Sequence, residues 1–133
     1  MKAYTNLSQS KKLAKILPIE SADMKWCFWK SEIDAPKLPT FGYDKDATEN
    51  CKNAEAVYLP CWSLAALLDI LESEIDGENG ETYKLNIEKD GTWWDVWYCE
   101  ERDEENPIET TSTEELVDAC YTMILKLKER SLI

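Results

Sequence analysis

Histidine is absent from the 133-residue sequence. Without an imidazole, a catalytic Ser or Cys would need a Lys or a carboxylate as its base, and a zinc site would have to be built from thiolates and carboxylates. The five cysteines are scattered and form no Cys-x-x-Cys pair. We therefore expect free, mostly buried thiols, with a disulfide or a metal site as the alternative. We assign no catalytic, cofactor-binding or metal-binding residue.

Long apolar runs are also missing. No stretch approaches the roughly 18 apolar residues that a membrane-spanning helix needs, and residues 1–6 lead into a polar segment rather than the apolar region of a signal peptide. Apolar residues nevertheless make up 44% of the chain, as in a globular protein. The length fits one domain over residues 1–133, and we expect it to be cytoplasmic, with no membrane partner.

Positive charge is scarce, because 15 Lys and Arg face 27 Asp and Glu, for a net charge of −12. Residues 1–56 hold 9 basic and 8 acidic side chains, a balance of +1, whereas residues 57–133 hold 6 and 19, a balance of −13. Phosphate binding requires a basic surface, so we expect no direct nucleic-acid binding. The acidic clusters at 69–81 and 100–109 are expected to be solvated surface or, alternatively, a mimic of DNA that inhibits a host nucleic-acid-binding protein.

Aromatic residues are densest at 92–99, which predicts a strand. Asp90-Gly91 just before it is typical of a β-hairpin turn, so we predict a hairpin over 82–99 with a two-residue loop. The predicted register places apolar pairs on one face, with Trp94 in the core. The pairs are Ile87 with Trp94, Leu85 with Val96, and Tyr83 with Tyr98.

Trp93 and Trp97 point to the other face of this hairpin, beside Lys84. Another segment of the chain or a second copy would cover them, or they form a binding surface, because Trp is frequent at interface hot spots. We therefore take Trp93, Trp97 and Lys84 as the candidate interaction surface. The expected partner is a protein or a second copy of the chain.

Three amphipathic helices are predicted. The first covers 7–17 and ends at Pro18, the second covers 62–75 with Ser63 as its N-cap, and the last begins with a capping box from Ser112 to Glu115. Strands are expected at 25–30 and 54–59. Residues 31–53 are predicted to form a long loop, with a short strand near 39–43 as the alternative. The sequence thus predicts an α+β fold in which the hairpin and one or two further strands form a small antiparallel sheet, with two or three helices packed on it.

Three segments carry a resemblance to a known family: residues 15–24 (KILPIESADM), 59–71 (LPCWSLAALLDIL) and 117–128 (VDACYTMILKLK). The chain resembles short uncharacterised proteins of phages, prophages and mobile elements of gut bacteria. Members of that family tend to have Ala where this chain has Cys61, which argues against a required thiol there. The resemblance implies a phage or mobile-element accessory protein and transfers no site residue. We accordingly expect a non-enzymatic role through protein-protein contacts.

Overall fold

The computed structural model describes residues 1–29, 39–41 and 56–133 and confirms the α+β fold. Its helices in these ranges are α1 (Leu7–Leu13), α3 (Leu64–Ile70) and α4 (Leu116–Glu129), with a short 3-10 helix at Ile19–Ser21. The chain divides into two compact units, one formed by Tyr4–Ala66 and the other by Met1–Ala3 with Leu67–Ile133. That the chain forms one domain stays a prediction.

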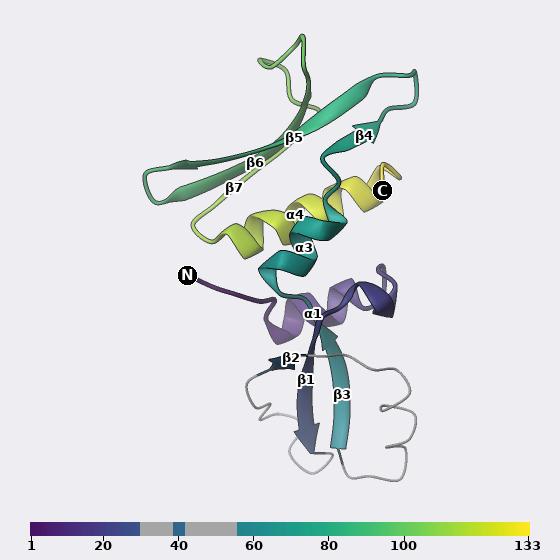
Figure 1. Cartoon of the computed structure of the whole chain (residues 1–133), viewed down its shortest axis with the longest axis vertical. Coiled ribbons are helices and arrows are strands. Elements are labelled where there is room, and N and C mark those ends of the chain that lie inside the picture. Colours follow the sequence, from purple (N-terminus) through teal and green to yellow (C-terminus); the bar gives the residue numbers. More distant parts are fainter. Residues whose placement is uncertain (30–38, 42–55) are drawn as a thin grey trace. The chain divides into compact units, whose positions relative to one another are not determined.

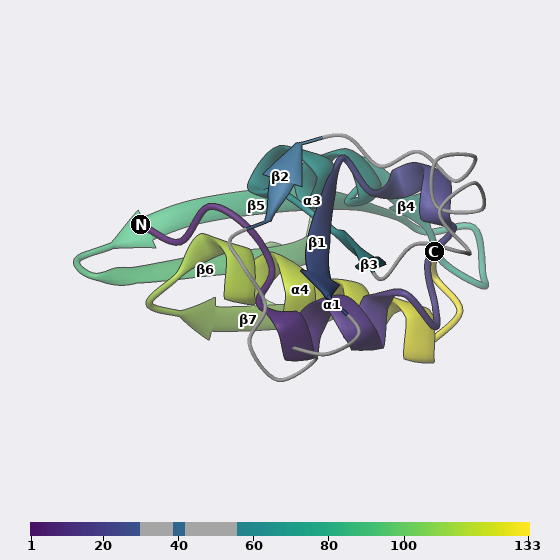
Figure 2. The same ribbon diagram turned by 90° about the horizontal axis from the view of Figure 1, so that it is seen from below.

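The second unit is built on a four-stranded antiparallel sheet in the order β4-β5-β6-β7 (Figure 1). Its strands are β4 (Glu74–Asp76), β5 (Thr82–Asp90), β6 (Trp93–Glu100) and β7 (Glu109–Thr113). The predicted hairpin is therefore flanked by two further strands. Helix α4 lies along one face of this sheet and packs on β6 and β7, as the view from below in Figure 2 also shows.

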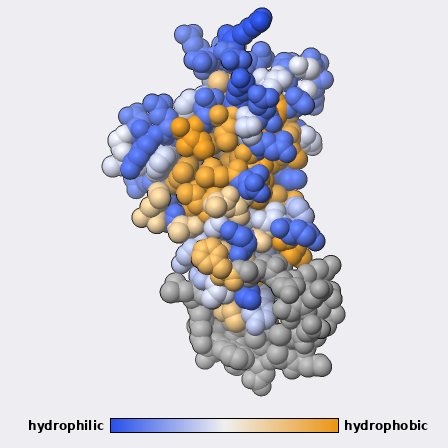
Figure 3. Space-filling view, in the orientation of Figure 1, coloured by the Kyte–Doolittle hydropathy of each residue, from blue (hydrophilic) through white to orange (hydrophobic). Residues whose placement is uncertain are grey.

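The predicted apolar stripe of α4 is confirmed, because all five of its residues are buried. They are Leu116, Cys120, Met123, Ile124 and Leu127. They form a core with Val96 and Tyr98 of the sheet, and the Tyr98 hydroxyl donates a hydrogen bond of 2.6 Å to the Glu72 carbonyl oxygen. Burial raises the pKa of Tyr98 because it disfavours the phenolate. Figure 3 shows apolar side chains gathering over α4 and hydrophilic ones over the connection between β6 and β7.

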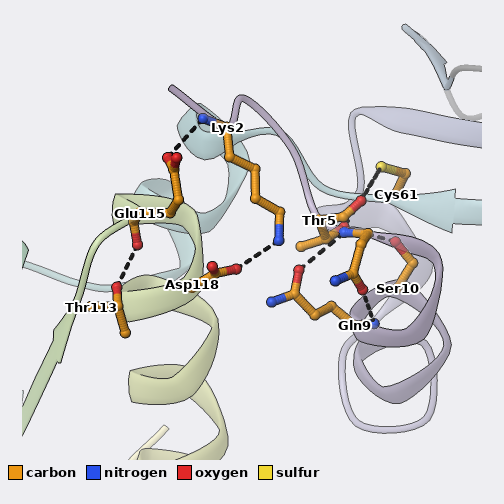
Figure 4. Close-up of polar contacts among 9 residues, drawn as sticks. Lys2, Thr5, Gln9, Ser10, Cys61, Thr113, Glu115 and Asp118 are labelled. Carbon is orange, nitrogen blue, oxygen red and sulfur yellow. Dashed lines mark hydrogen bonds and ion pairs between the residues drawn. The ribbon is translucent and has the colours of Figure 1, made fainter.

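The predicted start of this last helix is wrong. Ser112 lies in β7, and α4 begins at Leu116 with Glu115 as its N-cap, without a side-chain capping bond. Thr113 instead donates its hydroxyl to the Glu115 carbonyl oxygen at 2.5 Å, and the Glu115 carboxylate accepts the Lys2 backbone N–H at 2.7 Å (Figure 4). The strand was missed because β-branched Thr residues at 110, 111 and 113 fit a sheet as well as a helix cap.

The predicted hairpin register is wrong, because the two-residue loop lies one residue later in the chain than expected. The two-residue loop is Gly91-Thr92, so Asp90 pairs with Trp93 and Ile87 pairs with Val96. Gly91 has a positive φ of 63°, whereas the φ of Thr92 is not positive. This fits a turn that needs a positive φ only at its first central position. A loop at Asp90-Gly91 of the other common type would have required it at Asp90 as well. Each strand keeps its predicted faces because the partners shift by two residues.

The second predicted helix is shorter than expected. α3 ends at Ile70, and Ile75 lies in β4, where it is buried opposite Tyr83. Ser63 acts as the predicted cap, since its Oγ accepts the Ala66 backbone N–H at 3.2 Å. An apolar residue at helical spacing also fits a short buried strand, so periodicity alone did not separate the two.

The first unit contains a three-stranded antiparallel sheet in the order β2-β1-β3. Its strands are β1 (Met24–Trp29), β2 (Thr40–Phe41) and β3 (Ala56–Cys61). Strands β1 and β3 were expected near these positions, and β2 only as the alternative to a continuous loop. They were expected in a single sheet with the hairpin, whereas the described strands form two sheets. α1 ends at Leu13, and turns rather than helix lead on to Pro18. The remainder of the long loop predicted over 31–53 lies outside the described residues.

A buried polar cluster crosses the core of this first unit (Figure 4). Ser10 lies 2.7 Å from the Thr5 hydroxyl, and its Oγ accepts the Trp26 indole N–H at 3.1 Å. Thr5 Oγ1 in turn accepts the Trp62 backbone N–H at 3.2 Å and lies 3.6 Å from the Cys61 sulfur. Burial raises the pKa of Cys61, while the hydroxyls of Thr5 and Ser10 oppose the shift. The cluster thus pairs buried polar groups with one another, as burial of such groups requires.

Candidate interaction face

The face of the four-stranded sheet opposite α4, which we call the open face, carries the predicted surface residues. Side chains alternate along each strand, so the residues flanking buried Val96 and Tyr98 point away from α4. On β6 these are Trp93, Asp95, Trp97 and Cys99. The register places Asn86 of β5 and Thr110 of β7 on either side of Trp97. The open face is thus centred on an aromatic and acidic row.

A groove of about 410 Å³ is cut into the open face beside Trp97. Its lining comes from three strands and from the connection between β6 and β7, and comprises Asn86, Glu88, Asp95, Trp97, Cys99, Glu104, Pro107 and Thr110. Two successive turns shape that connection, through backbone bonds from Asp103 N to Glu100 O and from Asn106 N to Asp103 O. Figure 1 shows this connection projecting from the sheet on the side away from α4, and Glu104 and Pro107 of the connection line the groove.

The groove is acidic. Among the described residues that line it, three are carboxylates and none is Lys or Arg. Lys84 does not line it, because its ammonium group points to Glu101 at 3.2 Å and to Glu74 at 3.9 Å. These ion pairs are largely exposed, so they orient Lys84 more than they stabilise the fold.

The structure separates the three predicted surface residues. Trp97 lines the groove and is half-buried, whereas Trp93 lies at the hairpin tip opposite Asp90 and is 47% exposed. Lys84 lies toward the other end of β5. That these residues bind a partner stays a prediction. The sequence did not predict Glu104 and Pro107 as groove residues, because residues 100–110 were expected to form a solvated acidic connection.

Trp94, expected in the core, is only half-buried. It pairs with Thr113, three residues before α4 begins, so it lies near the end of the face that α4 covers. The Lys89 ammonium lies 5.4 Å from the centre of its ring. A cation above the ring stabilises a partly exposed Trp.

The thiols and carboxylates show no metal-binding arrangement in the described parts of the chain, where no three His, Cys, Asp or Glu are placed to bind one ion. Cys27, Cys61, Cys99 and Cys120 are free, and all but Cys27 are buried. No helix in the described ranges is long and apolar enough to cross a membrane.

Comparison with known proteins adds no relative: no family model, no curated protein and no solved structure matches the chain. The chemistry of the open face therefore carries the functional argument.

Proposed function

We propose that this chain is a non-enzymatic accessory protein that binds another protein through the open face, in the phage or mobile-element context that the sequence resemblance implies. The observation that best supports the proposal is the placement of Trp93 and Trp97 on the same strand of a face that α4 does not cover. Trp is enriched among the few residues that carry most of the binding energy at protein interfaces.

The two indoles suit a contact larger than a small-molecule site. Trp93 and Trp97 are four residues apart on one strand, so their Cα atoms lie about 13 Å from each other. Trp97 supplies a concave point of contact in the groove, and Trp93 an exposed one at the hairpin tip. A typical stable interface covers about 800 Å² on each partner, so a protein surface can reach both.

The charge of the open face favours a different protein over a second copy. Glu88, Asp95 and Glu104 line the groove, and Asp90 pairs with Trp93. Two such faces in contact would bring like charges together, which disfavours association. We therefore propose a partner with a basic contact surface rather than self-association through this face.

The test begins with affinity purification from the native host, with mass spectrometry to identify the partner, which is then purified. Its affinity is measured by calorimetry for the wild type and for Trp93→Ala and Trp97→Ala. Loss of a hot-spot Trp is expected to weaken binding by about 2 kcal/mol or more, roughly 30-fold. Trp94→Ala is the matched control, because Trp94 lies on the same strand but on the opposite face. Circular dichroism confirms that each variant is folded.

Equal affinity of the partner for folded Trp93→Ala, Trp97→Ala and wild type would refute the proposal. So would a partner that loses affinity only with Trp94→Ala, since that result would place the contact on the opposite face of the hairpin. Light scattering on the purified chain tests self-association, and a dimer that Trp97→Ala dissociates would also contradict the proposed partner.

An acidic mimic of DNA is a second candidate, favoured by the carboxylates that three segments of the chain bring to one groove. Such an inhibitor would bind the phosphate-binding surface of a host protein. DNA would then compete with the chain for that partner, and the affinity would fall steeply with salt. A partner that binds DNA and the chain at the same time would exclude this second candidate while leaving the first intact.

A further inference from the structure

We infer that the groove beside Trp97 binds an arginine side chain of the partner, an inference that rests on the function proposed above. The volume of the groove, about 410 Å³, lies in the range of roughly 300–1,000 Å³ typical of binding pockets. It is therefore large enough for one long side chain entering from a partner.

No Lys or Arg in the described part of the chain forms an ion pair with the carboxylates of the groove. Glu88, Asp95 and Glu104 have no ion-pair partner among the described residues, whereas Lys84, the basic residue of the predicted surface, is already paired with Glu101 and Glu74. A cation bound in the groove would supply opposite charge to carboxylates from three segments of the chain. The groove thus favours a cation.

The hydrogen-bonding groups of the groove are mainly acceptors. The Asn86 amide nitrogen donates to the Lys84 carbonyl oxygen at 3.0 Å and to the Cys99 sulfur at 3.5 Å, which leaves the Asn86 side-chain oxygen to accept a bond. With the three carboxylates, this oxygen complements a ligand with several N–H donors. An arginine side chain carries five in one plane, and an ammonium only three.

Trp97 distinguishes a guanidinium from other cations. The flat guanidinium stacks on an indole and holds less water than an ammonium, so arginine gains more from an aromatic wall than lysine does. A metal ion is not favoured, because no three acidic or thiol side chains of the described residues are placed to bind one. Arginine fits both the acceptors and the indole.

The test uses the full chain with ¹⁵N-labelled tryptophan, titrated at 0.15 M salt with hexaarginine, hexalysine or hexacitrulline. Citrulline has nearly the shape of arginine without its charge. The Trp97 indole resonance is assigned by its loss in Trp97→Phe. Hexaarginine is expected to shift that resonance, hexalysine to bind several-fold more weakly, and hexacitrulline to cause no shift.

Glu104→Gln is the test variant, and Glu105→Gln is its matched control. Both residues are exposed neighbours and both substitutions remove one charge, but only Glu104 lines the groove. Glu104→Gln is expected to weaken hexaarginine binding roughly two- to fivefold, the usual effect of one exposed ion pair. Replacing all three groove carboxylates by amides (Glu88→Gln, Asp95→Asn and Glu104→Gln) is expected to weaken hexaarginine binding roughly tenfold or more. Glu105→Gln is expected to retain wild-type affinity for hexaarginine.

Equal effects of Glu104→Gln and Glu105→Gln would overturn the inference, because they would indicate general attraction to an acidic chain. An unshifted Trp97 resonance, or equal binding of hexaarginine and hexacitrulline, would overturn it too. If the groove fails these tests while Trp97→Ala still abolishes binding of the purified partner, the arginine inference is wrong and the proposed function stands. If the partner binds Trp97→Ala unchanged, the arginine inference is wrong, and if it binds Trp93→Ala unchanged as well, the proposed function is refuted too.

Discussion

Replacing Ser10 by Ala tests the buried polar cluster of the Tyr4–Ala66 unit. Ser10 and Thr5 are fully buried and Trp26 is 8% exposed. The substitution removes the oxygen that accepts the Trp26 indole N–H at 3.1 Å and takes away one neighbour of the Thr5 hydroxyl. Thr5 keeps the Trp62 backbone N–H, so the indole N–H is the group that loses its only hydrogen bond in the cluster.

A buried donor without a partner costs about 1–3 kcal/mol. Against this, Ala is a better helix former than Ser by up to about 0.5 kcal/mol, and Ser10 lies inside α1. We therefore expect Ser10→Ala to lower the free energy of unfolding by about 1–2 kcal/mol. Because the Ser10 hydroxyl also opposes the raised pKa of Cys61, the pKa of that thiol should rise further in the variant.

Urea unfolding followed by circular dichroism measures the change. Ser8→Ala is the matched control, because Ser8 lies on the same helix and is exposed, so it gains helix propensity without losing a buried bond. A double-mutant cycle with Trp26→Phe should give a coupling of about 1 kcal/mol, since the phenyl ring has no donor to leave unpaired. If Ser10→Ala is as stable as Ser8→Ala, or if the cycle is additive, the indole bond contributes nothing and the reasoning fails.

Two further predictions concern the second unit. Burial raises the pKa of Cys120 from 9.0 to about 12, so the unfolded chain loses this proton at a lower pH than the folded one. The contribution of Cys120 to the free energy of unfolding is therefore constant below about pH 9 and falls above it, by up to about 1.4 kcal/mol per pH unit. Urea unfolding at pH 8 and pH 10 should show a smaller fall in the free energy of unfolding for Cys120→Ala than for wild type. Equal falls in the two proteins would contradict the raised pKa of Cys120. Gly91→Ala should destabilise the hairpin by about 1–2 kcal/mol, because Gly91 has φ of 63°. Thermal unfolding measures this loss, with Thr92→Ala as the control because Thr92 has no positive φ. Equal melting temperatures of the two variants would contradict the observed loop.

The sequence predicted what depends on long apolar patterns. The stripe of α4 and the apolar face of β6 recur over enough residues to identify each element and its buried side. The short strands β4 and β7 carry too few residues for a pattern, and they form because β5 and β6 offer free edges to pair with. The loop at Gly91-Thr92 was missed for a related reason: Asp90-Gly91 and Gly91-Thr92 both satisfy turn chemistry, and the choice depends on the pairing of whole strands.

Of the candidate site, the sequence predicted what depends on the alternation along one strand and did not predict what depends on contacts between distant segments. Alternation along β6 was sufficient to place Trp93 and Trp97 on the face away from the core, and a two-residue shift of partners did not alter that. The groove was not predictable, because it depends on Glu104 and Pro107 reaching back over the sheet, and such contacts have no sequence period. The two indoles consequently have different roles in the proposal. Trp97 is held in an acidic hollow that selects the chemistry of a ligand, whereas Trp93, exposed at the hairpin tip, extends the contact to the area that a protein partner requires.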